Sequence, residues 1–160
     1  VAKVGKYADE ALAFAGKLGE KLRGKLPHKS LYVKKGGIIV EKGSSKRLGD
    51  NLKKAKKYPP QEKGFAAHHI IPHGHTHPDV IKTREIYWKY MGYGKIDDAI
   101  NGVWLPQKKG VGPGAYHRTL HTRTYFKALR ERLEKARSAD DVREILEQIR
   151  KELENGTFPH

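Results

Sequence analysis

The sequence of 160 residues contains no cysteine, which excludes disulfide bonds, thiolate zinc fingers and a cysteine nucleophile. It also lacks any apolar run that approaches the roughly 18 residues of a transmembrane helix. Acidic residues are scarce: 18 Asp and Glu stand against 33 Lys and Arg, and the formal net charge is +15. Such a surplus says nothing about the fold, but it favours a polyanionic partner.

The positive charge is concentrated in the first part of the chain. Residues 1–67 carry a net charge of +11, residues 68–122 carry +3 and residues 123–160 carry +1. The last stretch is rich in charge but balanced, which is typical of solvated helix faces. The first stretch is therefore either a nucleic-acid contact or a solubilising arm.

The chain begins with Val1, and we expect it to be part of a longer polypeptide. Apolar residues recur at three- and four-residue steps from Val4 to Leu22, which predicts an amphipathic helix with lysines on its other face. Such a helix can bind a membrane surface or pack on protein, and we favour packing. Residues 1–27 are thus interpreted as a helical linker from an upstream region, and 28–160 as the domain.

The remaining pattern predicts an α+β fold that is mostly helical. Two short apolar runs around a glycine-containing turn predict a hairpin over 31–40. Further strands are predicted at 65–71 and, after an Asn-Gly turn, at 103–105. Helical periodicity predicts helices at 48–57, 79–91, from about 116 to 136, and from an N-cap at Ser138 to about 154.

Histidines are the candidates for chemistry. His68 and His69 are adjacent in a predicted strand, and His117 and His121 are spaced i, i+4 in a predicted helix. Two imidazoles at that spacing leave one face of a helix and can share a metal ion, although two exposed histidines would show the same spacing. A metalloprotease is excluded, because Arg118 stands where that chemistry needs a glutamate.

The order of these motifs resembles the HNH/endonuclease VII superfamily, whose ββα-metal core cuts phosphodiester bonds. A strand with two histidines precedes Asn101, a second strand and the helix with HxxxH. The segment 64–72, GFAAHHIIP, further resembles the AHH family, named for its Ala-His-His motif, and the likeness covers roughly 46–130. It implies a central HNH-like motif between an N-terminal helix and hairpin and C-terminal helices.

The resemblance also implies roles for individual residues. His68, His117 and His121 would bind one divalent metal ion, with Zn, Ni, Mn and Mg as candidates. His69 would be the general base, because an imidazole that is neutral at pH 7 can take a proton from water. Asn101 would tie the two strands together and hold the base in position.

Other residues near the motif are secondary candidates. Neighbours on a regular strand point to opposite faces, so we expect the two adjacent histidines at a distorted strand end that Pro72 helps to break.

Lys108, Lys109 and Arg118 are candidates for contacts with backbone phosphates. The loop after the predicted strand at 65–71 holds three more histidines, His73, His75 and His77. We interpret this loop as exposed and polar, although His73 could replace one of the assigned metal ligands.

Members of the AHH family are typically C-terminal nuclease toxins of large bacterial polymorphic proteins. The resemblance therefore implies a DNA endonuclease that is secreted or delivered from the producing bacterium and acts in the cytoplasm of a target cell. An acidic immunity protein would cover the cationic cleft in the producer. Two alternatives stay open. One is a non-catalytic nucleic-acid-binding domain with a structural metal. The other is a ribonuclease, because no feature of the sequence indicates whether the site distinguishes RNA from DNA by the sugar 2′-hydroxyl.

Overall fold

The computed structural model describes residues 26–61, 64–110, 112–116 and 119–160. The predicted amphipathic helix, and with it nearly all of the predicted linker, lies outside the described residues. Elsewhere the fold is α+β and mostly helical, as predicted. Its elements are β1 (Leu31–Lys34), β2 (Ile38–Glu41), α2 (Ser45–Lys54), β3 (Phe65–His69), α3 (Pro78–Met91), the 3₁₀ helix η3 (Ala99–Asn101), β4 (Gly102–Pro106), α4 (Arg123–Leu133) and α5 (Ala139–Glu154).

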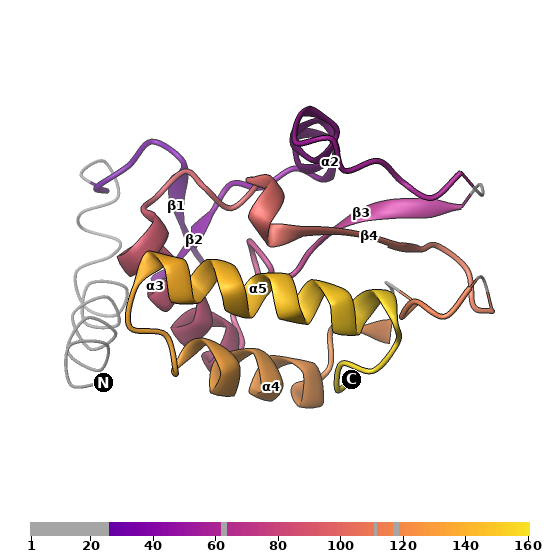
Figure 1. The fold of residues 1–160 in the computed structure, drawn as a ribbon. Coiled ribbons are helices and arrows are strands. Elements are labelled where there is room, and N and C mark those ends of the chain that lie inside the picture. The colour runs from indigo at the N-terminus through magenta and orange to yellow at the C-terminus, as the bar shows by residue number, and fades with distance from the viewer. Residues whose placement is uncertain (1–25, 62–63, 111, 117–118) are drawn as a thin grey trace.

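The strands form two small antiparallel sheets (Figure 1). The predicted hairpin is confirmed as β1 and β2, with Leu31 opposite Glu41. β3 pairs with β4 although α3 lies between them in the chain, and this pairing places His69 opposite Gly102. Since the loop and helix between β3 and β4 fold back on the paired strands, residues far apart in sequence meet at the end of β3.

Helix α2 packs directly against the start of β4. A Cβ atom on Gly102 would lie only 2.7 Å from Leu48 Cδ1, so a side chain at that position would force the helix outward. Leu48 and Leu52 are buried on this face, while the lysines at the end of the helix are exposed. The absence of a side chain at Gly102 therefore lets α2 approach the end of β3, where the histidines are.

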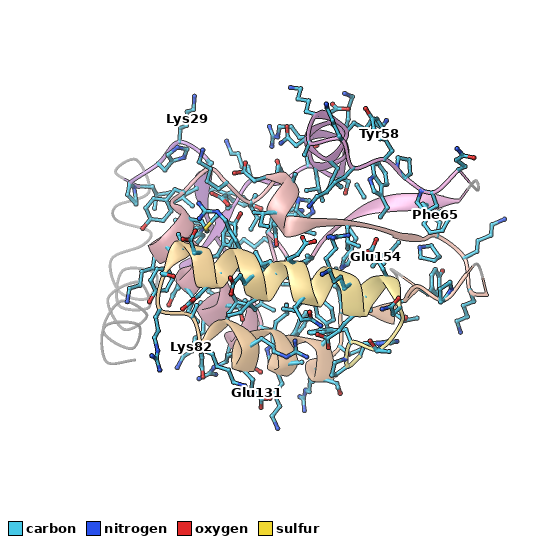
Figure 2. All side chains as sticks on the ribbon, in the orientation of Figure 1. Lys29, Tyr58, Phe65, Lys82, Glu131 and Glu154 are labelled. Atoms are coloured by element: carbon cyan, nitrogen blue, oxygen red, sulfur yellow. The ribbon has the colours of Figure 1, made fainter. Side chains whose placement is uncertain are left out.

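Helices α3, α4 and α5 enclose the main apolar core. In Figure 1, α5 runs below β4 and α4 runs below α5, and Figure 2 shows side chains filling the space between these elements. The core residues of the last two helices recur at helical spacing and are fully buried: Leu129, Leu133, Val142, Leu146, Ile149 and Leu153. No helix among the described residues is long and apolar enough to cross a membrane.

Most predicted boundaries are confirmed within a few residues, but the start of α4 is not. Helix α4 begins at Arg123, because Thr122 is extended (φ −113°, ψ 163°) and its hydroxyl accepts a hydrogen bond from Tyr125 N–H as an N-cap. The described residues between 119 and Thr122 are therefore not part of the α-helix predicted from 116, and His121 lies in the segment before α4. His117 lies outside the described residues.

Candidate functional site

A cavity of about 560 Å³ opens beside the end of β3. Among the described residues, five histidines line it, together with one lysine from the hairpin. The lining comes from β1, the start of α2, the end of β3, the loop after β3 and the segment before α4: Lys34, Ser45, Ala66, Ala67, His68, His69, Pro72, His73, Gly74, His75, Thr76 and His121. Two separate parts of the sequence, residues 68–75 and the segment before α4, thus contribute imidazoles to one cavity.

His69 is paired with a carboxylate. Its Nε2 lies 2.7 Å from Asp97 Oδ1, and both residues are 7% exposed. Asp97 stands in the loop between α3 and η3, 28 residues after His69. A buried carboxylate that accepts from one imidazole nitrogen fixes the ring orientation and leaves the other nitrogen as the proton acceptor.

Asp97 is held by the start of α2 as well as by the histidine. Ser44 N–H donates to Oδ1 at 3.0 Å, and Arg47 Nε donates to Oδ2 at 2.7 Å. Burial alone raises the pKa of Asp97, but the hydrogen bonds from His69, Ser44 and Arg47 outweigh it and lower the pKa to about 2. The carboxylate is therefore ionised at neutral pH.

Asn101 ties the two strands together at the same place. It is fully buried; its Oδ1 accepts from Ile71 N–H at 2.8 Å, and its Nδ2 donates to the carbonyls of Ile71 and Ile96 at 3.1 and 2.9 Å. Its own backbone carbonyl accepts from Ile70 N–H. These bonds lock the chain directly after β3, whereas the contact to the His69 ring comes from Asp97.

His68 lies on the other side of the strand from this pair. Its ring centroid is 5.7 Å from that of His121 and 6.3 Å from that of Tyr125. Tyr125 is buried and donates from its hydroxyl to the carbonyl of Ile70 at 2.6 Å, which fastens the start of α4 to the end of β3. The segment before α4 is thereby kept close to His68.

The strand remains regular through both adjacent histidines, so the expected distortion is not found. His68 is paired with Val103 and His69 with Gly102, and the next amide, Ile70 N–H, donates to Asn101. The two rings accordingly contact different groups, as alternation on a strand requires. Both still line the cavity, because they are the last residues of β3.

The loop after β3 brings two further histidines into the cavity, so it is not the exposed polar loop that the sequence suggested. The ring of His73 lies 5.0 Å from that of His69, and the ring of His75 lies 4.6 Å from that of His121. Burial lowers the pKa of both, assisted by the neighbouring His69 in the first case and by Lys34 in the second. His77 instead caps α3 by accepting from Asp79 N–H.

Two of the three predicted phosphate contacts, Lys108 and Lys109, do not line this cavity. Lys108 and Lys109 are exposed in the turn after β4 and are not among the lining residues, and Arg118 lies outside the described residues. The basic side chain that does line the cavity is Lys34, which donates to the carbonyl of Gly74 at 2.6 Å. Sequence reasoning missed both Lys34 and Asp97; for Asp97, its position just before Asn101 was the available signal.

The donor chemistry fits a divalent metal ion, although the described residues do not form a complete ligand set. Within them, no three His, Asp or Glu side chains converge closely enough to hold an ion. Two imidazole nitrogens do approach each other: His75 Nε2 and His121 Nδ1 lie 3.1 Å apart. Imidazole nitrogens suit zinc, nickel and related metals.

Comparison with known families gives a match over most of the chain. A family model described as AHH, a nuclease family of the HNH/ENDO VII superfamily with conserved AHH, matches residues 50–155. The matched span contains β3, β4 and both helices that follow, and thus every cavity histidine described above. Neither the curated proteins nor the solved structures give a match.

Proposed function

The chain belongs to the AHH family of nucleases within the HNH/ENDO VII superfamily, and from this premise we propose that it is a metal-dependent DNA endonuclease with His69 as its general base. The observation that carries the proposal is the buried hydrogen bond between His69 and Asp97 at the edge of a histidine-lined cavity. A non-catalytic binding domain would have no need for an imidazole oriented by an ionised carboxylate.

His69 is proposed to start the reaction by accepting a proton. Since Asp97 is ionised, the Nε2 that faces it carries the hydrogen, and Nδ1 keeps a lone pair. Nδ1 takes a proton from water while the water oxygen attacks phosphorus, and the bond from phosphorus to the sugar oxygen opposite breaks. The electron pair of that bond stays on the sugar oxygen, which takes a proton from solvent water to become a hydroxyl. Asp97 stabilises the imidazolium that forms, as a carboxylate partner does in other histidine-based sites.

His68, His117 and His121 are the residues that would hold the metal ion. The bound metal would supply positive charge that stabilises the phosphate and the departing oxygen. The hydrogen bond from Tyr125 to Ile70 keeps the start of α4 near β3, which supports the closeness of the His68 and His121 rings. Asn101 is proposed to maintain the same end of β3 from the other side.

The positive charges supply the affinity for a nucleic-acid backbone. Lys34 stands in the cavity itself, and the exposed lysines that follow it lie at the end of α2. Lys108 and Lys109 stay candidates for contacts farther along the duplex. Binding that depends on such contacts weakens steeply with salt, because each neutralised phosphate releases counterions.

The biological role proposed from the family resemblance is that of a bacterial toxin. The nuclease would be delivered from the producing cell as part of a longer secreted polypeptide and would act in the cytoplasm of its target. An acidic immunity protein would then neutralise the net charge of +15 in the producer. Association of the two proteins would slow as ionic strength rises.

A plasmid-cleavage assay tests the proposal. The protein is incubated with supercoiled plasmid in Mg²⁺, Mn²⁺, Ni²⁺ and Zn²⁺, with and without a chelator, and in parallel with a structured RNA. We expect nicking of plasmid that the chelator abolishes. Plasmid that is bound but stays intact with every metal would contradict the proposal in favour of a binding domain, and cleavage of RNA alone would replace DNA as the substrate.

A further inference from the structure

The loop between β3 and α3 carries a histidine that contacts the other side of the cavity. His75 Nε2 lies 3.1 Å from Nδ1 of His121, and the two rings meet nearly edge-on, with centroids 4.6 Å apart and planes at 77°. The two residues are 46 positions apart in the sequence. Their approach is therefore a product of the fold and not of a local turn.

The separation of these nitrogens fits a shared metal ion. Two nitrogens bound tetrahedrally to one zinc ion at about 2.0–2.1 Å are about 3.3 Å apart. His75 and His121 thus already stand close to the distance that a common ion requires. The two nitrogens share a hydrogen bond, which coordination of a common ion would replace.

The backbone around His75 is held in place by two cations. Lys34 Nζ donates to the carbonyl of Gly74 at 2.6 Å, and Arg84 Nη1 donates to the carbonyls of His75 and Pro72 at 2.9 and 3.2 Å. Arg84 is fully buried in α3, a placement that costs considerable desolvation. Groups that fix the orientation of a ligand are the usual second layer of a metal site.

From these contacts we propose that His75 is an additional ligand of the divalent metal, sharing the ion with His121. The inference rests on the proposed function, because it concerns the metal of that nuclease. A fourth imidazole would still admit a phosphate oxygen, since catalytic zinc sites expand to five ligands. The neighbouring His73 serves as the comparison residue, because its ring lies against His69 and not against His121.

Metal binding and spectroscopy test the proposal with His75→Ala and His75→Gln against the matched control His73→Ala. Zn²⁺ affinity is measured by calorimetry, and the Co²⁺-loaded proteins are examined by proton NMR, where each coordinated histidine gives a strongly shifted imidazole N–H signal. We expect both His75 variants to lose one shifted signal and to bind Zn²⁺ about 10- to 100-fold more weakly than the parent. The control should match the parent in both measurements.

The outcomes separate this inference from the proposed function. If the parent binds metal and the His75 variants keep its affinity and all its shifted signals, His75 is not a ligand, but the nuclease proposal stands. An equal loss in His73→Ala would also overturn the assignment. If the folded parent binds neither Zn²⁺ nor Co²⁺, both proposals fail. Thermal unfolding of the metal-free variants checks that each one folds.

Discussion

The cavity and the α4–α5 pair use charged residues in opposite ways. On α4 and α5, charges lie near the surface and meet opposite charges nearby: Arg132 forms two hydrogen bonds with Glu152, and Arg150 lies between Glu147 and Glu154. Figure 2 shows Glu131 projecting outward from α4. Around the cavity, by contrast, Arg84 and Asp97 are buried and each holds several groups in place.

The comparison distinguishes charged side chains that keep the surface soluble from charged side chains that hold other parts of the chain in position. Surface ion pairs contribute little, because water and salt screen them and the side chains lose freedom. A buried charge is costly and is retained only where its hydrogen bonds compensate it. Arg84 and Asp97 both act on chain segments that carry histidines, whereas the helix pair derives its stability from apolar packing.

The largest effect on stability is expected from Arg84→Met. The substitution keeps most of the side-chain volume but leaves the carbonyls of Pro72 and His75 without their donor. We expect a loss of about 3 kcal/mol in the free energy of unfolding. Urea unfolding measures it, with the exposed Arg143→Met as the control; equal losses in the two variants would remove the distinction between the two regions.

Asp97→Asn should reduce DNA cleavage by up to about 10⁴-fold, as the same exchange does at the carboxylate partner of a catalytic histidine. An amide cannot stabilise the imidazolium of His69 by charge, although it can keep a hydrogen bond. Zn²⁺ affinity should not change, because Asp97 faces His69 and not His121. Initial cleavage rates and calorimetry check both expectations, and full activity in this variant would show that the carboxylate is only structural.

The same variant gives a pH dependence of stability. The pKa of Asp97 is lowered from 3.8 to about 2 in the folded protein, so its charge stabilises the fold above pH 3.8, and this stabilisation is lost as the pH falls toward 2. The difference in unfolding free energy between the parent and Asp97→Asn should therefore be constant near neutral pH and shrink in acid. A difference that is independent of pH would contradict the lowered pKa.

The smallest effect is expected from Arg150→Met on α5. Its two glutamate partners lie at the surface, so their loss should cost less than about 1 kcal/mol. Plasmid cleavage should be unchanged. Added salt should reduce the difference from the parent further, which urea unfolding at two ionic strengths measures.

Local sequence signals predicted most of the fold. The Ser138 N-cap and the acidic first turn that follows fixed the start of α5, and the Asn101-Gly102 turn located β4. The predicted start of α4 was too early. The apolar periodicity already includes Leu120, but the helix begins only after Thr122, whose side chain caps it. A periodic pattern reports a buried face and cannot by itself locate the first helical turn.

The site was only partly predictable, for a related reason. His68, His69 and Asn101 belong to recognisable motifs, and the structure brings them to one strand end. Asp97 stands next to another acidic residue in a loop, a pattern that is typical of a solvated turn. Only tertiary folding brings its carboxylate into hydrogen-bond contact with His69. Likewise, His75 reaches His121 through a loop whose course depends on the buried Arg84.

The most direct test of the account is single-turnover cleavage of DNA by the parent, His69→Ala and the surface control His160→Ala at saturating metal. Without a proton acceptor, His69→Ala should be slower by about 10²- to 10⁴-fold, while its metal affinity matches that of the control. Thermal unfolding checks that the variant is folded at the assay temperature, because it loses the buried hydrogen bond to Asp97. A folded, metal-loaded His69→Ala protein that cuts as fast as His160→Ala would contradict the assignment of His69 as the general base.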